Sequence, residues 1–169
     1  SPFPHLQTLV LDGNSISDWS IVRRAVAMFP NLQALHLNGN CLGENLEGLK
    51  ELAEDQTPRR LHTLFLNENK LASWKAVAAL SEYVLLELKV QRNPVTEGLS
   101  PVASPQLLRQ VLIALMPTLL RLNSSEIPVK ERTASERYLV GIALQQGNQV
   151  INALSEGCNV QRHVQRLMD

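Results

Sequence analysis

The sequence LHTLFLNENKL, residues 61–71, decides the fold, because three other parts of the chain repeat its pattern. The pattern is LxxLxLxxNxL, in which Ile or Val can replace Leu. It recurs as LQTLVLDGNSI at 6–16, LQALHLNGNCL at 32–42 and LLELKVQRNPV at 85–95. Four matches to one template, each with every fixed position occupied, are typical of a protein built by stacking one structural unit.

The spacing of the leucines predicts a short strand in each repeat. Side chains of a strand alternate between two sides, so Leu at the fourth and sixth positions points inward while the third and fifth positions point outward. A single unit cannot bury its own apolar side, and stacked neighbours form a continuous core instead. Leu119 and Leu122 occupy the first and fourth positions of a fifth, degenerate strand, after which the stretch 124–127 breaks the template.

The ninth position of every full repeat is asparagine. A buried carboxamide at this place, where the chain leaves the strand, pairs with backbone groups of the turn that would otherwise lack partners. We therefore expect Asn14→Ala to cost about 1–3 kcal/mol of folding free energy, the penalty of an unpaired buried group. The asparagines are Asn14, Asn40, Asn69 and Asn93.

Helical segments are predicted between the strands. Polar residues suited to cap a helix precede three of them, and apolar residues at helical spacing follow. These segments are 19–29 after Ser17-Asp18, 74–83 after Ser73 and 105–116 after Ser104, and a further helix is expected within 43–55. Strand and helix in alternation predict an α/β solenoid, a right-handed horseshoe with a parallel sheet on its concave face and helices on its convex face.

The chain divides into a solenoid, residues 1–123, and a helical C-terminal cap, residues 124–169. Within the cap we expect one helix from about 128 to 146 and a second stretch from 149 to 167 that a glycine interrupts. A solenoid needs its end repeats covered, and the cap does this at one end. The first repeat has no such cover, so its strand edge either meets an upstream segment or associates with another molecule.

Composition and charge exclude several classes of function. The 169 residues carry 16 Lys and Arg against 16 Asp and Glu, so the chain lacks the basic excess that binds nucleic acids and anionic membranes. No run approaches the roughly 18 apolar residues that cross a membrane. Two distant cysteines, Cys41 and Cys158, indicate free thiols in a reducing, cytoplasmic setting. No catalytic or metal-binding motif occurs, so we expect no enzyme activity, no metal and no cofactor.

The third, fifth, seventh and eighth template positions face the concave side, where solenoids present their binding surfaces. Phe65 places a large apolar ring in a row that should face water, and exposed aromatic residues anchor many interfaces. Cover by a loop or by the tail is the alternative. The Glu131-Arg132 pair is expected on a solvated helix face. The predicted protein-binding residues are His36, Phe65, Asn67, Glu87, Lys89, Arg92 and Arg121.

The repeats resemble those of leucine-rich repeat proteins, and further phrases resemble tubulin-folding cofactor E in particular. Two repeats continue into Trp19 and Trp74, and Asn93-Pro94 precedes the last helical segment of the solenoid. The solenoid ends in RLNSSEIPVKERTASERYLV, residues 121–140, which is similar to the phrase that closes this region of the cofactor. Ser135 departs from it, because a small apolar residue is expected there.

This resemblance covers residues 6–140 and implies a cytoplasmic chaperone of the microtubule cytoskeleton. It implies binding to α-tubulin, or to a tubulin–cofactor complex, while αβ heterodimers are assembled or taken apart. Nucleotide hydrolysis would belong to tubulin and its other cofactors. The CAP-Gly and ubiquitin-like domains of the family are not visible in this sequence. The alternative is a general intracellular leucine-rich repeat adaptor of the phosphatase-regulator, axonemal or spliceosomal type.

Overall fold

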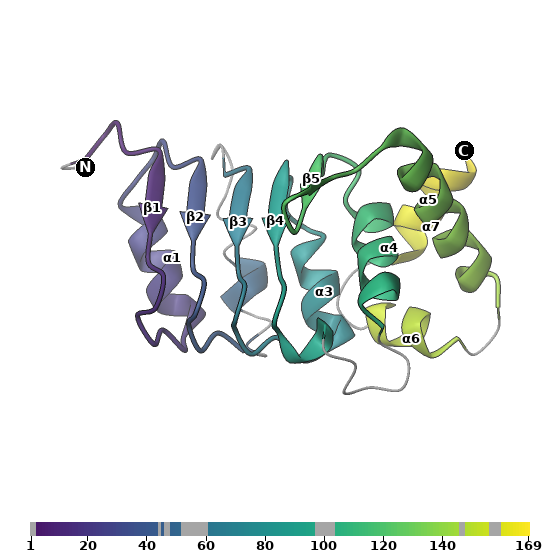
Figure 1. The fold of residues 1–169 in the computed structure, drawn as a ribbon, viewed down its shortest axis with the longest axis horizontal. Helices are drawn as coiled ribbons and strands as arrows, with labels where there is room; N and C mark the ends of the chain where they lie inside the picture. The colour runs from purple at the N-terminus through teal and green to yellow at the C-terminus, as the bar shows by residue number, and fades with distance from the viewer. Residues whose placement is uncertain are drawn as a thin grey trace.

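The repeats contribute neighbouring strands to one sheet in the computed structural model, which describes residues 3–43, 45, 48–51, 61–96, 104–145, 148–155 and 160–169 (Figure 1). Strands β1 to β5 lie parallel and in chain order. They are β1 Thr8–Val10, β2 Ala34–His36, β3 Thr63–Phe65, β4 Glu87–Lys89 and β5 Arg121–Leu122. The predicted α/β solenoid with a parallel sheet is confirmed.

Equal template positions lie opposite one another in this sheet, so the fourth position forms one continuous column across it. The column runs Leu9, Leu35, Leu64, Leu88 and Leu122. From the second repeat onward each of these side chains is fully buried. A slip of one residue would turn a strand's leucine toward water, so the hydrophobic pattern fixes the register.

A sixth strand, β6 (Ser125–Glu126), pairs antiparallel with β5 and was not predicted. The template does stop here, but Asn123 and Ser124 adopt left-handed backbone conformations, with φ of 53° and 68°, and turn the chain back on itself. A two-residue turn with positive φ at both positions matches the twist of paired strands. The sheet therefore continues across residue 123, and the division into two domains at that point stays a prediction.

The ninth-position asparagines hold the turn of the repeat before them. Asn40 Oδ1 accepts hydrogen bonds from the backbone N–H groups of Asn14 and Ile16, at 3.0 and 2.9 Å. Its Nδ2 donates to one backbone carbonyl of each of the two repeats, at 2.9 and 3.0 Å. Asn69 and Asn93 make corresponding contacts one and two repeats further along. The predicted role of this position is thus confirmed for the buried asparagines.

Asn14 is the exception, and its predicted burial was wrong. Its side chain is exposed, and Nδ2 donates to the nearby Asp12 carbonyl at 3.1 Å. The described chain has no repeat before the first one, so there is no earlier turn for Asn14 to hold. At the other end of the solenoid Asn123 has a different role. Its Oδ1 accepts a hydrogen bond from Val90 N at 2.9 Å, in the place where the equivalent N–H of the preceding repeat, that of Leu66, donates to the backbone carbonyl of Lys89.

Helices α1 and α3 lie behind the sheet in the view of Figure 1. The capped helices of the solenoid are α1 Trp19–Ala27, α3 Trp74–Leu80 and α4 Pro105–Leu115. The first two end two and three residues earlier than predicted. Of the predicted helix within 43–55, residues 48–51 are helical and Leu49 is buried, while residues 44, 46, 47 and 52–55 lie outside the described part.

Each of these helices begins after a polar side chain. Asp18, Ser73 and Ser104 accept a hydrogen bond from a backbone N–H of the first turn, at 2.8, 3.4 and 3.0 Å. The tryptophans that open α1 and α3 are buried, with Trp19 at 0% and Trp74 at 7% exposure. Trp19 Nε1 donates to a backbone carbonyl of the next repeat at 3.2 Å. The indole therefore links its helix to the neighbouring rung as well as filling the core.

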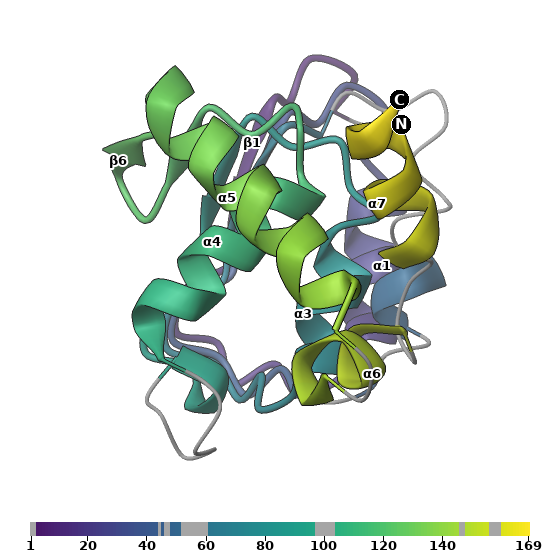
Figure 2. The same ribbon diagram turned by 90° about the vertical axis from the view of Figure 1, so that its right-hand side faces the viewer.

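Helices α5 (Val129–Ala143), α6 (Gln149–Ser155) and α7 (Val160–Met168) close the C-terminal end of the solenoid (Figure 2). Helix α5 packs along α4, and α6 packs against α3. Leu139 and Leu154 bury their side chains completely in this packing. Helices are present where the sequence predicted them, and the glycine expected to interrupt the second stretch lies outside the described residues.

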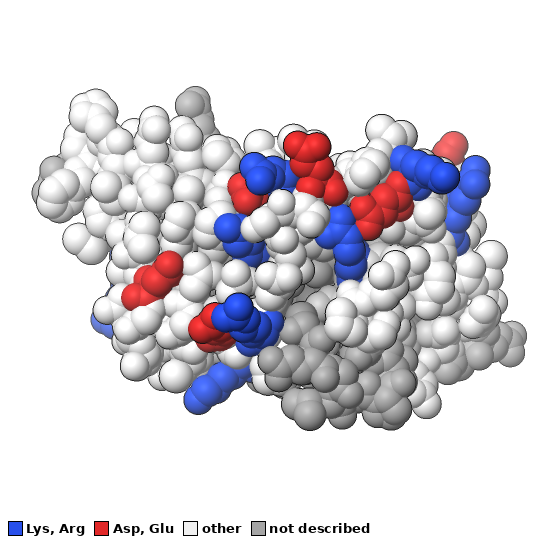
Figure 3. Space-filling model, viewed as in Figure 1, with Lys and Arg blue, Asp and Glu red and all other residues white. Residues whose placement is uncertain are grey.

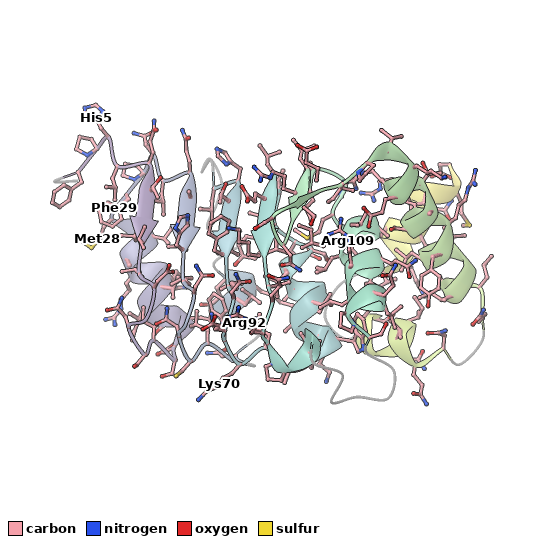
Figure 4. All side chains as sticks on the ribbon, in the orientation of Figure 1. His5, Met28, Phe29, Lys70, Arg92 and Arg109 are labelled. Carbon is pink, nitrogen blue, oxygen red and sulfur yellow. The ribbon has the colours of Figure 1, made fainter. Side chains whose placement is uncertain are left out.

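Among the described residues, the first repeat, at one edge of the sheet, is less buried than the second. Leu6, Leu9 and Leu11 are half-buried, whereas their equivalents in the second repeat are at most 1% exposed. The rings of Phe3 and Phe29 lie beside this edge with their centroids 6.1 Å apart, and Figure 4 marks Phe29 there. Association through this edge stays a prediction.

Candidate protein-binding face

The fifth template position brings three predicted site residues into one column on the concave face, which is the face of the sheet opposite α1 and α3. Strands β2, β3 and β4 lie side by side, so His36, Phe65 and Lys89 are register neighbours. The His36 ring stacks on the Phe65 ring with a centroid distance of 4.3 Å and an interplanar angle of 20°. Lys89 Nζ lies over the Phe65 ring, 4.0 Å from its centroid. We call these three residues the stacked column.

The stacked column explains how a large apolar ring is tolerated on this face. Phe65 is half-buried, and side chains from the two neighbouring strands, His36 and Lys89, lie against its ring. The predicted alternative was that a loop or the tail covers the ring. A stacked pair contributes about 0.5–1.5 kcal/mol, and a cation over a ring contributes about 0.5–1 kcal/mol at an exposed site. The ring is thus held in one orientation without a partner, which lowers the entropic cost of binding.

The seventh template position forms a ladder of side-chain oxygens along the same face. Asp12 Oδ1 accepts a hydrogen bond from Asn38 N at 2.7 Å, and Asn38 Oδ1 accepts one from Asn67 N at 3.0 Å. Asn67 Oδ1 in turn accepts one from Gln91 N at 2.8 Å. The oxygen of Asn67 thus has one of its two acceptor positions occupied by Gln91 N, and its Nδ2 group can donate to a partner.

The remaining predicted residues bring charge to the C-terminal half of the face. Glu87 on β4 lies in register with Arg121 on β5, which lies opposite Glu126 on β6. Arg121 and Glu126 are exposed, and Glu87 is half-buried. Figure 3 shows acidic and basic side chains mingled over this half and few of them over the N-terminal half. The face therefore has a polarity along its length.

Arg92 occupies the eighth template position, where the backbone is left-handed in every full repeat. The residues there are Gly13, Gly39, Glu68 and Arg92, with φ of 67°, 64°, 57° and 54°. Glycine adopts this conformation freely, whereas an L-residue with a Cβ atom costs about 1–2 kcal/mol. The third and fourth repeats carry this cost at residues whose side chains form an ion pair, with Arg92 Nη1 donating to Glu68 Oε1.

A pocket of about 260 Å³ lies where the concave face meets α4 and β5, and sequence reasoning did not find it. Its walls come from segments that are distant in the chain and adjacent in the fold, so no local pattern reveals it. Figure 4 marks Arg92 near the end of β4 and Arg109 on α4. The described lining consists of Gln91, Arg92, Pro105, Leu108, Arg109, Leu112, Leu122 and Asn123.

Arg109 is fixed in the pocket wall by an ion pair with the first turn of α5. Its Nε donates to Glu131 Oε1 at 2.6 Å, its Nη2 donates to Glu131 Oε2 at 2.9 Å, and its Nη1 donates to Leu122 O at 3.1 Å. The hydrogen bond from Arg109 holds the pKa of Glu131 below its ordinary value. Such a two-pronged contact restricts the guanidinium to one orientation.

The prediction of a solvated Glu131-Arg132 pair was therefore wrong. Glu131 holds Arg109, and Arg132 Nη1 donates to two backbone carbonyls at the end of α4, at 2.9 and 3.2 Å. The carbonyl of Ile113 belongs to the last turn of α4, whose carbonyls have no partner within the helix, so the arginine satisfies it. The carbonyl of Met116 also accepts a hydrogen bond from Leu119 N at 3.1 Å. The sequence spacing placed both residues on a helix but could not show that this helix packs against α4.

The structure shows no metal-binding cluster among the described residues, whose His, Cys, Asp and Glu side chains form no group of three or more suited to a metal ion. In the same part of the chain no helix has the length and apolar character needed to cross a membrane. Cys41 is a half-buried free thiol, and Cys158 lies outside the described residues.

Solved structures with a similar fold include a chain of the Drosophila melanogaster SNF/U2A′ complex. The aligned region covers 88% of this chain and 87% of the Drosophila chain, with a TM-score of 0.55 and 18% sequence identity. A chain of the Chaetomium Mex67:Mtr2 structure covers 78% of this chain and 90% of its own length, with a TM-score of 0.47 at 19% identity. The repeat, the sheet and the first of these likenesses define a leucine-rich repeat solenoid.

No protein-family model matches the chain. Among curated proteins it is similar to a human protein described as tubulin-specific chaperone cofactor E-like protein, with 29% identity over 139 residues. The match covers 80% of this chain and 31% of the human protein, so the chain spans about a third of that relative's length.

Proposed function

We propose that this chain is a non-enzymatic, protein-binding scaffold of the cytoplasm and forms part of a tubulin-folding cofactor. In that role it binds α-tubulin while αβ heterodimers are assembled or dissociated. The 29% identity to a tubulin-specific chaperone cofactor E-like protein supports this proposal, as do the phrases around Trp19, Trp74 and residues 121–140. The observation that carries it is the stacked column on the concave face.

The stacked column has the features of the centre of an interface. Aromatic and cationic side chains supply most of the binding energy in interfaces, and they do so when they are held rigidly near the centre and surrounded by polar groups. Phe65 is held by its rung neighbours, and donors and charges surround it. The proposed contact residues are His36, Phe65, Asn67, Glu87, Lys89, Arg92 and Arg121.

Capture of soluble αβ-tubulin on the immobilised chain tests this proposal. We expect the wild-type chain to capture tubulin and Phe65→Ala to weaken capture by about 2 kcal/mol, which is about 30-fold in Kd. Ile21→Ala is the control, because it also truncates a solvent-accessible apolar side chain, on the helical side of the solenoid. Its capture of tubulin is expected to equal that of the wild type.

Circular dichroism and thermal unfolding of all three proteins separate binding from folding. A folded Phe65→Ala variant that captures tubulin as well as the wild type would place the contact away from the stacked column. Equal losses in binding and in stability would make the ring structural. Absence of capture by the folded wild type would contradict tubulin binding by this chain and favour the general adaptor with another protein partner.

A further inference from the structure

The pocket between the concave face and α4 has an apolar interior and a polar mouth. Leu108, Leu112 and Leu122 lie in its wall and are at most 3% exposed. Arg92 contributes a side chain that is 74% exposed. An apolar interior with a few polar groups at the entrance is the usual build of a binding pocket. The pocket is continuous with the concave face, because Gln91 and Arg92 belong to both.

The size of the pocket indicates what it can hold. Its volume of about 260 Å³ lies below the range of about 300–1,000 Å³ that is typical of sites for cofactors and other small molecules. One large side chain of another protein fits this space better than a complete cofactor does. Interface anchors are commonly single aromatic or arginine side chains seated in such pockets.

The charge of the pocket indicates the neighbour of that side chain. Of its described lining residues two are arginines and none is acidic. The hydrogen bond with Glu131 holds Arg109 in the wall of the pocket, whereas the side chain of Arg92 is largely exposed at the mouth. A guanidinium stacks on an aromatic face and pairs with a carboxylate. An aromatic side chain that has a carboxylate beside it satisfies both properties.

The backbone of Arg92 gives a second, independent reason. The first two repeats place glycine at the equivalent left-handed position, yet the fourth places a long cationic side chain there, at φ 54°. Left-handed residues other than glycine gather at functional sites, because the strain persists where the side chain is needed. Glu68, in the same strained position one repeat earlier, pairs with Arg92 from the side of β3.

We propose that this pocket receives an aromatic side chain of a protein partner. Arg92 then binds a carboxylate that belongs to the same partner residue or to the residue next to it. The proposal deepens the proposed function, on which it rests for the protein nature of the occupant. The pocket itself can be tested without tubulin, so the two proposals can fail separately.

Titration of the ¹⁵N-labelled chain with small probes tests the proposal by NMR. N-acetyl-L-tryptophan carries both the aromatic ring and the carboxylate, N-acetyl-L-tryptophan amide carries the ring alone, and N-acetyl-L-aspartate carries carboxylates without a ring. We expect N-acetyl-L-tryptophan to shift the backbone amides of Gln91, Arg92 and Leu122. We expect the two other probes to bind at least about five-fold more weakly, since each lacks one contact.

Two glycine substitutions separate the charge of Arg92 from the shape of its turn. Arg92→Gly relieves the left-handed backbone and removes the charge, so it should unfold at no lower a temperature than the wild type and lose at least about five-fold in affinity for N-acetyl-L-tryptophan. Glu68→Gly gives the same backbone relief in the preceding repeat and removes the carboxylate that competes for Arg92. It should keep or increase the affinity for this probe.

Three results would overturn the proposal. The first is no shift of the pocket amides by N-acetyl-L-tryptophan up to its solubility limit. The second is equal affinity for the acid and its amide. The third is the same loss of affinity in Arg92→Gly and Glu68→Gly, which would assign the effect to the turn. Probe binding at the pocket by a chain that fails to capture tubulin would leave the pocket standing and refute the tubulin partner alone.

Discussion

Truncation of Asn69 to alanine is expected to destabilise the solenoid far more than the same change at Asn14. Asn69 is 6% exposed, and its Oδ1 accepts a hydrogen bond from Leu42 N at 3.1 Å. Its Nδ2 donates to the carbonyl oxygens of Leu37 and Leu66 at 2.8 and 3.2 Å. Alanine leaves the buried Leu42 N–H and these two carbonyls without their side-chain partner.

The magnitude follows from these three contacts. An unpaired buried polar group costs about 1–3 kcal/mol. The two carbonyls keep another donor, because Asn40 Nδ2 also donates to Leu37 O at 3.0 Å and Asn93 Nδ2 to Leu66 O at 2.8 Å, so the N–H group dominates. We expect a loss of about 3 kcal/mol for Asn69→Ala. At about 2–4 °C per kcal/mol for a chain of this size, the unfolding midpoint falls by about 6–12 °C. Asn14 is exposed, so Asn14→Ala should change the stability by less than about 0.5 kcal/mol.

Urea denaturation followed by circular dichroism, with wild type and both variants measured in parallel, checks this prediction. The slope of the free energy against urea should be the same for all three chains, so that the difference in midpoint reports stability alone. If Asn69→Ala loses less than about 1 kcal/mol, or no more than Asn14→Ala, the asparagine contacts do not have the energetic role assigned to them.

Two further predictions concern the C-terminal helices. Ser135 is 1% exposed and its Oγ has no hydrogen-bond partner among the described residues, so Ser135→Ala should raise the free energy of unfolding by about 1 kcal/mol. The control Thr133→Ala, on the exposed side of α5, should not raise it. Equal unfolding midpoints for wild type and Ser135→Ala would contradict this prediction. Burial, followed by the positive charge of Arg166, lowers the pKa of His163 below its ordinary value of 6.5. The unfolded chain therefore binds this proton more readily, and stability should fall as the pH drops below about 6.5. His163→Gln should flatten this part of the profile in denaturation experiments at about pH 7.5 and about pH 5.5, and an unchanged slope would assign the effect to another group.

The sheet and its register could be predicted from the sequence because they follow from local repetition. Each strand has its own copy of the template, and equal positions must lie side by side to keep Leu35 and Leu64 buried. The helix starts were equally local, because Asp18 and Ser73 each cap the turn that directly follows them.

The parts that the sequence could not reveal depend on contacts between distant segments. The β5–β6 hairpin needs left-handed conformations at Asn123 and Ser124. Neither residue is glycine, so the sequence does not indicate such a turn there. The roles of Glu131 and Arg132 depend on how closely α5 approaches α4. The spacing of charged residues within α5 does not predict this packing. For the same reason the stacked column was foreseen as an unusual Phe65, whereas its cover by rung neighbours was not.

The asparagine contacts set the order in which the repeats can complete their folding during synthesis. Asn40 completes the turn of the first repeat, Asn93 that of the third, and Asn123 reaches back to the fourth. The residue that completes the turn of the first repeat is synthesised one repeat later than the turn itself. Folding of the nascent chain must therefore run about one repeat behind its synthesis, and the hairpin that leads into the C-terminal helices supplies the last missing bond of the ladder.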